Sequence, residues 1–307
     1  MARYLVTGGA GFIGSHLCDA LLARGDTVRV LDDLSSGHRA NLPDGIEFQL
    51  GDIADPPAVE AAVEDVDGCF HLAAIASVAR GLTDWLGTHR ANLTGTIGVF
   101  DALRRTGRRV PVVYASSAAV YGDCPTLPIT EDLPLRPLSA YGADKLGCEL
   151  HARVATQVHG IPTVGLRFFN VYGSRQDPRS PYSGVISIFC DRLPRGDAIE
   201  IFGDGGQTRD FIHVSDVVAG LLAAMALHPA EASVANLCTG QPTSILALAK
   251  LVADQAGKPL GIHHAAPRVG EIRHSVGSMA RARAMLGLGD PRPLRQGLQD
   301  VLTPPNR

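Results

Sequence analysis

A tyrosine and a lysine lie four residues apart in the run Tyr141-Gly142-Ala143-Asp144-Lys145. In a helix this spacing puts the phenol and the ammonium on one face. A tyrosine with the ordinary pKa of about 10 is a poor base at neutral pH, but a neighbouring cation stabilises the phenolate and makes it a usable proton acceptor. Ser116 and Ser117 end an apolar run and supply a hydroxyl for the same chemistry. The alternative for the Tyr-Lys pair is a solvated pair on a helix surface.

A second cluster of informative residues is the run Thr7-Gly8-Gly9-Ala10-Gly11-Phe12-Ile13-Gly14, which follows a short apolar segment and opens a helical pattern. Glycine suits a tight turn where a Cβ would keep the backbone away from a pyrophosphate, and the N–H groups of the following helix attract phosphates. The run therefore predicts a dinucleotide-binding turn, with a purely structural glycine turn as the alternative.

The type of dinucleotide is indicated by Asp32, at the end of the next apolar segment. A carboxylate there binds both hydroxyls of an adenosine ribose and repels a 2′-phosphate. Residues 33–37 include no arginine to compensate, so NAD is favoured over NADP. Asp52 and Ile53 follow the third apolar segment, where we expect them to border the adenine.

These residues need a scaffold, and apolar segments alternate with helical patterns through the first half of the chain. The predicted strands cover residues 4–7, 27–31, 46–50, 69–72, 110–115 and 163–168, and the predicted helices cover 12–23, 57–64, 84–105 and 140–158. This order predicts an α/β fold with a Rossmann-type, doubly wound parallel sheet that binds ligands at the carboxyl ends of its strands. We expect residues 1–170 to form the cofactor domain with the catalytic residues. Residues 171–307 are expected to form mostly a smaller α/β substrate lobe, with some segments returning to the main sheet.

Composition excludes several other classes of protein. Among the 307 residues, 28 Lys and Arg stand against 31 Asp and Glu, so the chain has no basic surplus for nucleic acid. The six cysteines are dispersed without a C-x-x-C pair, and the eleven histidines form no H-E-x-x-H motif, so we expect neither disulfides nor a metal site. No apolar stretch approaches the roughly 18 residues that a membrane span needs. The composition predicts a soluble, cytoplasmic protein with no membrane partner.

The ordered motifs along the chain resemble those of the extended short-chain dehydrogenase/reductases, specifically the NAD-dependent nucleotide-sugar 4-epimerases. The motifs are residues 7–14, Asp32, residues 71–74, 92–96, 116–122, 141–145, 167–173 and 209–214. The resemblance implies that Ser117, Tyr141 and Lys145 are catalytic and that Asn92 orders the active-site helix. The implied cofactor contacts are Gly8, Gly11, Phe12, Ile13, Gly14, Asp32, Leu34, Ser35, Ser36, Gly37, Asp52, Ile53, Leu72, Ala73, Ala74, Asn92, Ser116, Tyr141, Lys145, Phe168 and Val171.

Binding of a nucleoside diphosphate requires positive charge, and the planar fork of arginine matches phosphate oxygens. Arg209 and Arg273 are the candidates, with ordinary surface arginines as the alternative. The resemblance implies UDP as the carrier. It adds Ser77, Ser117, Tyr141, Asn170, Gly184, Val185, Phe189, Phe202, Glu271 and Ser275 as substrate contacts.

The reaction is indicated by residues that the chain does not have. Related dehydratases carry an Asp-Glu pair after the active-site hydroxyl, and related decarboxylases usually keep a Glu before Val-Tyr-Gly; here Ala118 and Ala119 follow Ser117. What remains is redox chemistry without an added acid or base. The resemblance then implies 4-epimerisation of a UDP-hexose through a transient 4-keto sugar. A product-releasing dehydrogenase or dehydratase and a non-enzymatic NAD-binding sensor are the other classes.

Two residues bear on the identity of the sugar. Asp177 stands where related uronate epimerases often carry an arginine, which disfavours UDP-glucuronate, although Arg175 and Arg179 keep it open as the alternative. Ser275 stands where an aromatic closes the pocket of strict glucose/galactose enzymes, so a pocket for UDP-glucose/UDP-galactose that also admits the N-acetylhexosamines is expected. The resemblance also implies a homodimer that pairs the predicted helices 84–105 and 140–158 in a four-helix bundle.

Overall fold

The structure is a computed structural model that describes residues 1–178, 184–227, 229, 231–268 and 272–303. Its main sheet has seven parallel strands in the order β10-β6-β5-β4-β1-β2-β3. The strands are β1 (Arg3–Thr7), β2 (Thr27–Asp32), β3 (Glu47–Leu50), β4 (Gly68–His71), β5 (Val112–Ser117), β6 (Thr163–Phe168) and β10 (Ser233–Leu237). This confirms the predicted doubly wound parallel sheet, with strand bounds that differ by up to two residues from those expected.

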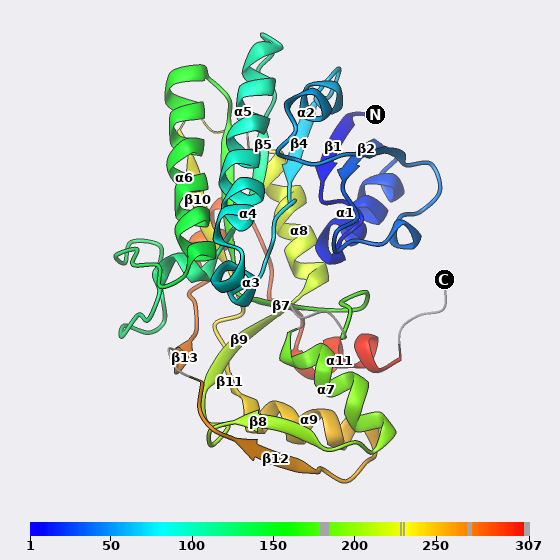
Figure 1. Cartoon of the computed structure of the whole chain (residues 1–307), viewed down its shortest axis with the longest axis vertical. Helices are drawn as coiled ribbons and strands as arrows, with labels where there is room; N and C mark the ends of the chain where they lie inside the picture. Colours follow the sequence, from blue (N-terminus) through cyan, green and yellow to red (C-terminus); the bar gives the residue numbers. More distant parts are fainter. Residues whose placement is uncertain (179–183, 228, 230, 269–271, 304–307) are drawn as a thin grey trace.

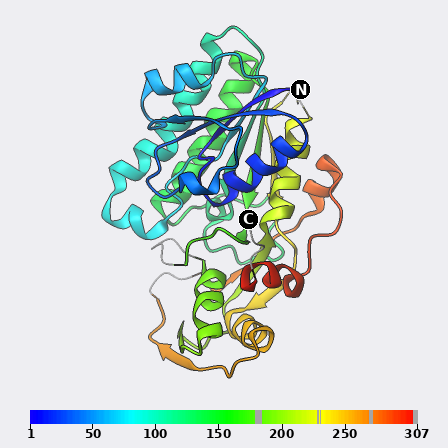
Figure 2. The same ribbon diagram turned by 90° about the vertical axis from the view of Figure 1, so that its right-hand side faces the viewer.

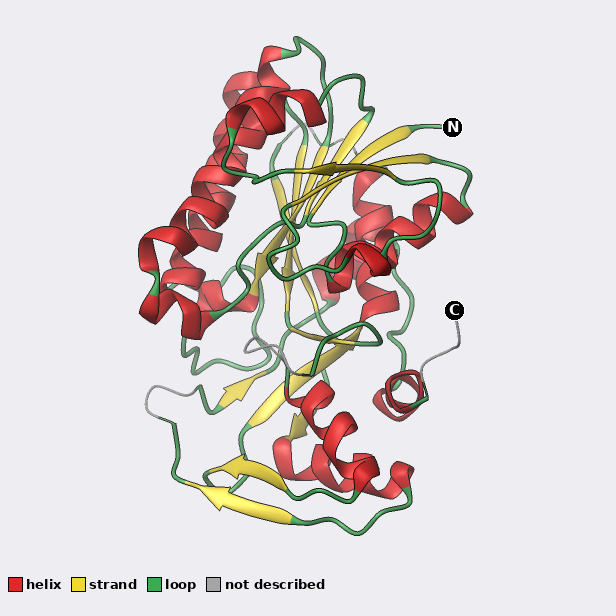
Figure 3. Ribbon diagram, turned by 45° about the vertical axis from the view of Figure 1, so that its right-hand side comes forward, coloured by secondary structure: helices red, strands yellow, loops and turns green. Residues whose placement is uncertain are grey.

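Helices cover both faces of the sheet because its strands are apolar on both sides (Figures 1 and 3). On β1, Val6 packs into the core under α1 (Phe12–Ala23) and α8 (Val214–Met225), whereas Leu5 packs into the core under the opposite helices. Those opposite helices are α2 (Pro56–Ala62), α5 (Gly95–Arg105) and α6 (Ala140–His159). Successive strand residues point to opposite faces, so each strand contributes to two cores.

Helix α6 carries the Tyr-Lys pair and has well-defined ends. The Ser139 hydroxyl accepts the N–H of Gly142 at 3.1 Å at its start, and Gly160 in the left-handed conformation (φ 69°) terminates it. The predicted helix 84–105 is helical throughout but is not a single α-helix. It consists of α4 (Trp85–His89), a π-helical turn η2 (Arg90–Thr94) and α5. A π-helical turn changes the directions in which its side chains point, and this turn includes Asn92.

The second lobe lies beyond the carboxyl ends of the main strands (Figure 2). Its strand β9 (Thr208–His213) pairs with β7 (Asn170–Tyr172), β11 (Pro242–Ser244) and β13 (His274–Ser275), and β8 (Ile199–Phe202) pairs with β12 (Ile262–Ala265). Helices α7 (Val185–Arg192), α9 (Ile245–Ala256) and α11 (Leu294–Leu302) enclose its own apolar core. The remaining elements are η1 (Arg39–Asn41), α3 (Val78–Thr83), η3 (Ala118–Tyr121), η4 (Leu193–Arg195) and α10 (Ala280–Leu286). Two later elements, α8 and β10, belong to the main sheet domain.

In the described part of the chain, every helix is too short or too polar to cross a bilayer. The same residues contain no group of three or more His, Cys, Asp or Glu side chains arranged to hold a metal ion. All six cysteines are free thiols.

A buried chain of hydrogen bonds joins the ends of β1 and β4 to the π-helical turn. Thr96 donates its hydroxyl proton to the Asn92 carbonyl at 2.6 Å, so it must accept the proton of His71 Nε2 at 2.9 Å. His71 Nδ1 is then an acceptor, and the Thr7 hydroxyl donates to it at 2.8 Å. The Thr7 oxygen in turn accepts the N–H groups of Leu72 and Ala73, each at 3.2 Å. Every group is satisfied only when His71 is neutral.

The charge state of His71 follows from this arrangement. Burial, with the nearby Lys145 ammonium as the second cause, lowers the pKa of His71 from 6.5 to about 3. Between pH 6.5 and about pH 3, His71 therefore stays neutral in the folded protein but is protonated in the unfolded chain. The contribution of neutral His71 to the free energy of unfolding is fully present above pH 6.5. Below pH 6.5 it falls by about 1.4 kcal/mol for each pH unit until the pKa of the folded state is reached.

We expect His71→Gln, which cannot titrate, to remove this contribution. Between pH 7 and pH 5 the wild-type free energy of unfolding should drop by about 2 kcal/mol more than that of the variant. Urea unfolding at both pH values measures the difference, and subtraction cancels the other titrating groups. His151→Gln, at an exposed position on α6, is the control and should behave like the wild type. Equal pH dependence in wild type and His71→Gln would contradict the assignment.

Candidate active site and cofactor cleft

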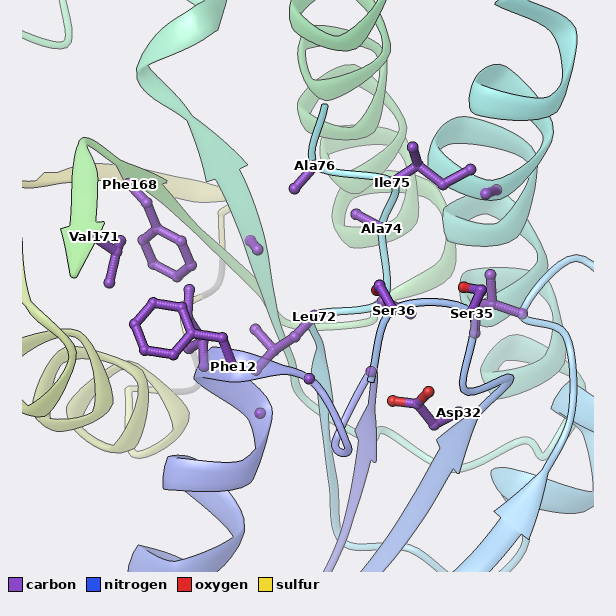
Figure 4. Close-up of a pocket in the computed structure, with 18 of the residues that line it drawn as sticks. Phe12, Asp32, Ser35, Ser36, Leu72, Ala74, Ile75, Ala76, Phe168 and Val171 are labelled. Carbon is purple, nitrogen blue, oxygen red and sulfur yellow. The ribbon is translucent and has the colours of Figure 1, made fainter. Parts of the chain in front are cut away.

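A cavity of about 500 Å³ runs along the carboxyl ends of the main strands. Figure 4 shows Asp32, Ser35 and Ser36 at one end of it and Phe168 and Val171 at the other. The residues expected at the cofactor or the substrate that line this cavity are Gly8, Gly11, Phe12, Ile13, Gly14, Asp32, Ser35, Ser36, Asp52, Ile53, Leu72, Ala73, Ala74, Ser116, Ser117, Tyr141, Lys145, Phe168, Asn170, Val171 and Gly184. One cavity thus holds the glycine-rich turn, the acidic residue and the Ser-Tyr-Lys set.

Gly8 and Gly14 of the glycine-rich turn have no space for a side chain. Gly8 has φ +70°, and a Cβ there would lie 2.7 Å from the nitrogen of Ala73, while a Cβ on Gly14 would lie 2.2 Å from the Gly8 carbonyl oxygen. Helix α1 begins directly after Gly11, which has no side chain to cap the first N–H groups. The turn therefore presents a helix N-terminus to the cavity, which is the geometry that binds a pyrophosphate.

Asp32, at the end of β2, connects the glycine-rich turn to the segment that follows β2. Its two carboxylate oxygens accept the N–H groups of Ala10 at 2.9 Å and Leu34 at 2.8 Å. Burial raises the pKa of Asp32, and these two bonds act against that rise. Each oxygen keeps a second lone pair, so a ribose diol can still bind.

Leu34 and Gly37 lie outside the cavity lining and instead shape its rim. Leu34 has a left-handed backbone (φ 58°), and a Cβ on Gly37 would lie 2.8 Å from the carbonyl carbon of Ala10. The segment they form closes over the glycine-rich turn, with the His38 N–H donating to the Ala10 carbonyl at 3.0 Å. Gly37 is therefore packed against the glycine-rich turn, and the expected cofactor contacts of Leu34 and Gly37 stay a prediction.

The π-helical turn positions the next wall. The buried Asn92 side chain lies outside the cavity lining, where it accepts the Ile75 N–H at 2.7 Å and donates to the Ile75 carbonyl at 3.2 Å. Ile75 and its neighbour Ala76 line the cavity, so Asn92 holds the cavity wall through backbone contacts. Next to it, Arg90 pairs with Asp52 at 3.0 Å, which fastens the end of β3 to the same turn.

The Ser-Tyr-Lys set is held at the carboxyl end of β5. Lys145 is only 2% exposed and donates to the Ala115 carbonyl at 2.9 Å, and its ammonium lies 5.9 Å from the centre of the Tyr141 ring. The Ser117 oxygen accepts the N–H of Ala119 at 3.1 Å, which leaves the hydroxyl proton available for donation. The solvated-surface alternative for the Tyr-Lys pair does not match this geometry, because both side chains line the cavity and the lysine is buried.

A buried ion pair supports this set from behind. Glu149 on α6 accepts the Ser116 hydroxyl at 2.5 Å and two bonds from Arg167, at 2.8 and 2.7 Å. Arg167 also donates to the Tyr121 hydroxyl at 2.7 Å, which donates to Asn236 at 2.7 Å. Three neighbouring strands and α6 are thereby tied together directly behind Ser117.

The other described substrate residues that were expected from the sequence lie outside the lining of this cavity. Ser77 is buried and caps α3 by accepting the Arg80 N–H at 3.0 Å, Val185 begins α7, and Phe189 is buried in the core of the second lobe. Ser275 on β13 is in register with Arg209 on β9, and Arg209 donates to the Thr208 carbonyl at 2.9 Å. Glu271 lies outside the described residues.

Two arginines of the second lobe have contacts that the sequence did not predict. Arg273 forms a two-pronged ion pair with Asp204, with both bonds 2.8 Å long, so a carboxylate already offsets its charge. The guanidinium of Arg268 stacks on Phe202, with its carbon 3.9 Å from the ring centre. Only the fold places Arg268 over this ring, 66 positions away along the chain.

Fourteen further residues line the cavity, and of these only Arg175 and Asp177 had been singled out in the sequence, as residues that bear on the identity of the sugar. They are Leu31, Asp33, His38, Asn41, Gly51, Ile75, Ala76, Arg80, Ala91, Ala115, Phe169, Arg175, Gln176 and Asp177. Most of them lie in loops that follow strands, where residue type is a weak guide to function.

Comparisons with known proteins agree with this arrangement. Residues 4–238 match the model of the family described as the NAD dependent epimerase/dehydratase family. The UDP-glucose 4-epimerase of Mycolicibacterium smegmatis is 39% identical over 292 residues, which cover 93% of this chain and 92% of that protein.

Two solved structures share the whole architecture. The UDP-glucose 4-epimerase of Thermotoga maritima with UDP-glucose has a TM-score of 0.93 at 34% identity, covering 98% of this chain and 97% of that one. The UDP-N-acetylglucosamine 4-epimerase of Methanobrevibacter ruminantium, in complex with UDP-N-acetylmuramic acid, has a TM-score of 0.92 at 32% identity with the same coverage. The family match, the relatives and the cavity lead to one conclusion: the chain belongs to the NAD-dependent epimerase/dehydratase family.

Proposed function

We propose that the protein is an NAD-dependent 4-epimerase of UDP-hexoses. The observation that carries the proposal is the single cavity that brings Ser117, Tyr141 and Lys145 together with the glycine-rich turn and Asp32. The names of the two solved relatives, both 4-epimerases of UDP-sugars, support the substrate class. The positions after Ser117 are Ala118 and Ala119, so no added carboxylic acid stands there to drive an elimination.

The cavity fits a nicotinamide dinucleotide. The turn around Gly8 and Gly14 leaves room for a pyrophosphate at the N-terminus of α1, and Asp32 keeps lone pairs for the adenosine ribose. Ser116, Phe168 and Val171 line the opposite end, where the nicotinamide would lie. We propose the cavity-lining residues of the first domain as the cofactor contacts, with Asn92, Leu34 and Gly37 acting through the backbone that they hold.

The protonation chemistry follows from the Ser-Tyr-Lys set. NAD, when bound, supplies a hydride acceptor and donor for C4 of the sugar. Tyr141, as the phenolate, accepts the proton of the 4-hydroxyl, and Lys145 stabilises that phenolate with its ammonium charge. Lys145 uses one of its three protons on the Ala115 carbonyl, so two remain for the phenolate side and the cofactor ribose. Ser117 donates its free hydroxyl proton to the same sugar oxygen and orients it.

The second lobe supplies the nucleotide site in this proposal. We infer that Phe202 and the stacked Arg268 contact the nucleotide, because an exposed planar cation over an aromatic ring offers both a stacking surface and charge for a diphosphate. Arg209, Arg273, Asn170, Gly184, Val185, Phe189, Glu271 and Ser77 remain proposed contacts. Asp177 in the cavity wall adds negative charge and favours a neutral hexose over UDP-glucuronate, which remains the alternative substrate.

Proton NMR of the purified protein, incubated in parallel with UDP-glucose, UDP-N-acetylglucosamine and UDP-glucuronate, tests the reaction. We expect a new anomeric signal of the 4-epimer without net formation of NADH. Tyr141→Phe should lower the turnover by roughly 10²–10⁴-fold, since it removes a general base. Tyr4→Phe, in the partly buried ring pair with Phe70, is the control and should keep normal turnover. Net NADH, or no product in any tube after NAD is added, would overturn the assignment.

The size of the sugar pocket depends on Ser275 in this proposal. We expect Ser275→Tyr to lower turnover of UDP-N-acetylglucosamine by roughly 10- to 100-fold while UDP-glucose turnover changes far less, because a bulky ring takes the space of the N-acetyl group. His274→Tyr, on the other face of the same short strand, is the matched control. Unchanged N-acetyl turnover in Ser275→Tyr would remove this residue from the specificity site.

We also propose that the protein is a cytoplasmic homodimer. Leu150, Val154 and Val158 form an exposed apolar stripe on α6, at 58%, 47% and 69% exposure, and α3 and α4 beside it expose Leu82, Trp85 and Leu86. Exposed apolar side chains grouped on neighbouring helices are typical of an interface. Pairing of α6 and the adjacent 85–105 helical segment across a two-fold axis would bury it in a four-helix bundle. Six free thiols are consistent with a reducing compartment.

Val154→Glu places a charge in the centre of this stripe. We expect the variant to sediment as a monomer at concentrations where the wild type sediments as a dimer, because a buried unpaired carboxylate is costly. Leu227→Glu changes an exposed leucine at the end of α8, away from the stripe, and should leave the association state unchanged. A monomeric wild type, or a dimeric Val154→Glu variant, would contradict the proposed interface.

A further inference from the structure

One face of the cofactor helix α1 is in contact with the loop that leads into the second lobe. Phe12, His16 and Asp19 lie at i, i+4 and i+7 on α1, so they form one stripe. The loop residues opposite them are Gly173, Ser174 and Arg175. The two sets meet in order along the helix, although about 155 positions separate them in the chain.

The three contacts differ in kind. A Cβ on Gly173 would lie 3.4 Å from the Phe12 ring and 2.5 Å from Val214, so the loop passes tightly between α1 and α8. His16 Nε2 lies 2.9 Å from the Ser174 carbonyl oxygen and donates to it. Arg175 Nη2 donates to Asp19 Oδ2 at 2.5 Å, in an ion pair whose arginine side chain is 19% exposed.

The backbone at Arg175 indicates that the loop is held in place. Arg175 has φ +67°, a left-handed conformation that costs free energy for a residue with a Cβ. Its second terminal nitrogen, Nη1, is buried and without a hydrogen-bond partner in the described structure. Such a conformation persists only where surrounding contacts impose it, and the contacts of this loop include the hydrogen bond and the ion pair with α1.

Both ends of this loop reach the cavity. Asn170 and Val171 precede the contact and line the cavity, and Gln176 and Asp177 follow it and do the same. The N-terminus of α1, at the other end of the stripe, faces the dinucleotide site. A rigid helix that binds phosphate at one end therefore sets the position of residues that line the substrate side of the same cavity.

We propose that the contacts of α1 with residues 173–175, above all the Asp19–Arg175 ion pair, couple occupancy of the dinucleotide site to occupancy of the nucleoside diphosphate site. Asp19 lies outside the cavity lining and is a positioning residue in this inference, whereas Arg175 pairs with Asp19 and also lines the cavity. The inference rests on the proposed function, since it assumes that the dinucleotide binds in this cavity and that the nucleoside diphosphate binds at the proposed site of the second lobe. Coupling is reciprocal, so a nucleoside diphosphate should slow release of the dinucleotide.

Exchange of bound NAD against excess labelled NAD, with and without UDP, measures this coupling without turnover. In the wild type we expect UDP to slow the exchange by about 5-fold or more, a typical coupling between two sites. Asp19→Asn and Arg175→Met should each reduce the effect of UDP to near 1-fold, and the double variant should be no worse than either single variant.

Two further variants separate the ion pair from other effects. Arg175→Gly accepts the left-handed backbone without strain but lacks the guanidinium, so it should also lose the coupling. Arg195→Met removes an ion pair of the same 2.5 Å length, to Asp191 on the far side of the second lobe, and should couple as the wild type does. Thermal melting of each variant verifies that it is folded.

The outcomes distinguish the inference from the function on which it rests. If UDP slows exchange equally in Asp19→Asn, Arg175→Met and wild type, or has no effect in a wild type that binds NAD and epimerises its substrate, the inference is overturned and the function stands. If the wild type neither retains nor binds NAD, the proposed function itself is overturned.

Discussion

The buried hydrogen bonds that run from Thr7 through His71 and Thr96 to Asn92 set the shape of the cofactor cleft. The direction of each bond is fixed, because Thr96 has only one proton and donates it to the Asn92 carbonyl, so His71 must donate to Thr96 and accept from Thr7. This network begins at Thr7, the first residue of the glycine-rich run, and ends at Asn92 in the π-helical turn, so it connects two segments that border the cavity. Polar groups buried this deeply must be satisfied, and that requirement leaves the cavity walls only one mutual position.

Helix α6 depends on this frame and transmits it to the reacting groups. Its inner face carries Tyr141 and Lys145 at the cavity and Glu149 one turn further on, where the carboxylate bonds to Ser116 and Arg167. On another side, Asp144 accepts from or pairs with His89 at 2.7 Å, which ties α6 to the end of α4 beside the π-helical turn. The hydroxyl of Ser117, the phenol of Tyr141 and the ammonium of Lys145 are therefore held by contacts on several sides. Proton transfer requires reacting groups to be positioned to within a fraction of an ångström.

The second lobe is built with different constraints. Its own core is apolar and closed, and it meets the main domain through β7 and the loop that follows. Two of its arginines form ion pairs: Arg273 pairs with Asp204, and Arg175 pairs with Asp19 across the boundary between the lobes. In Asp204 the arginine bond holds the pKa of the carboxyl well below its usual range. A cavity shared by two lobes can then bind two phosphate-bearing ligands without an excess of unpaired cations around it.

Much of the cofactor half could be predicted from local spacing. Glycines at 8, 11 and 14, a carboxylate at 32 and the phenol-ammonium pair at 141 and 145 each depend on a turn, a strand end or one helical repeat, and such short-range geometry is dictated by the covalent chain. The parallel order of the sheet followed for the same reason, since alternating strands and helices leave few right-handed arrangements. These residues do line one cavity, as the spacing indicated.

Only the tertiary structure decided which side chains contact one another between segments that are distant in the sequence. Residue type suggested Arg273 as a phosphate ligand, but in the folded protein it pairs with Asp204. The sequence predicted residues 84–105 as one helix, but the structure has a π-helical turn at Asn92, whose side chain bonds to the backbone of Ile75. The neutral tautomer of His71, the stacking of Arg268 on Phe202 and the Asp19–Arg175 pair are of the same kind. Each depends on groups between 17 and 156 residues apart, whose meeting is determined by packing of the whole chain and leaves no periodic trace in the sequence.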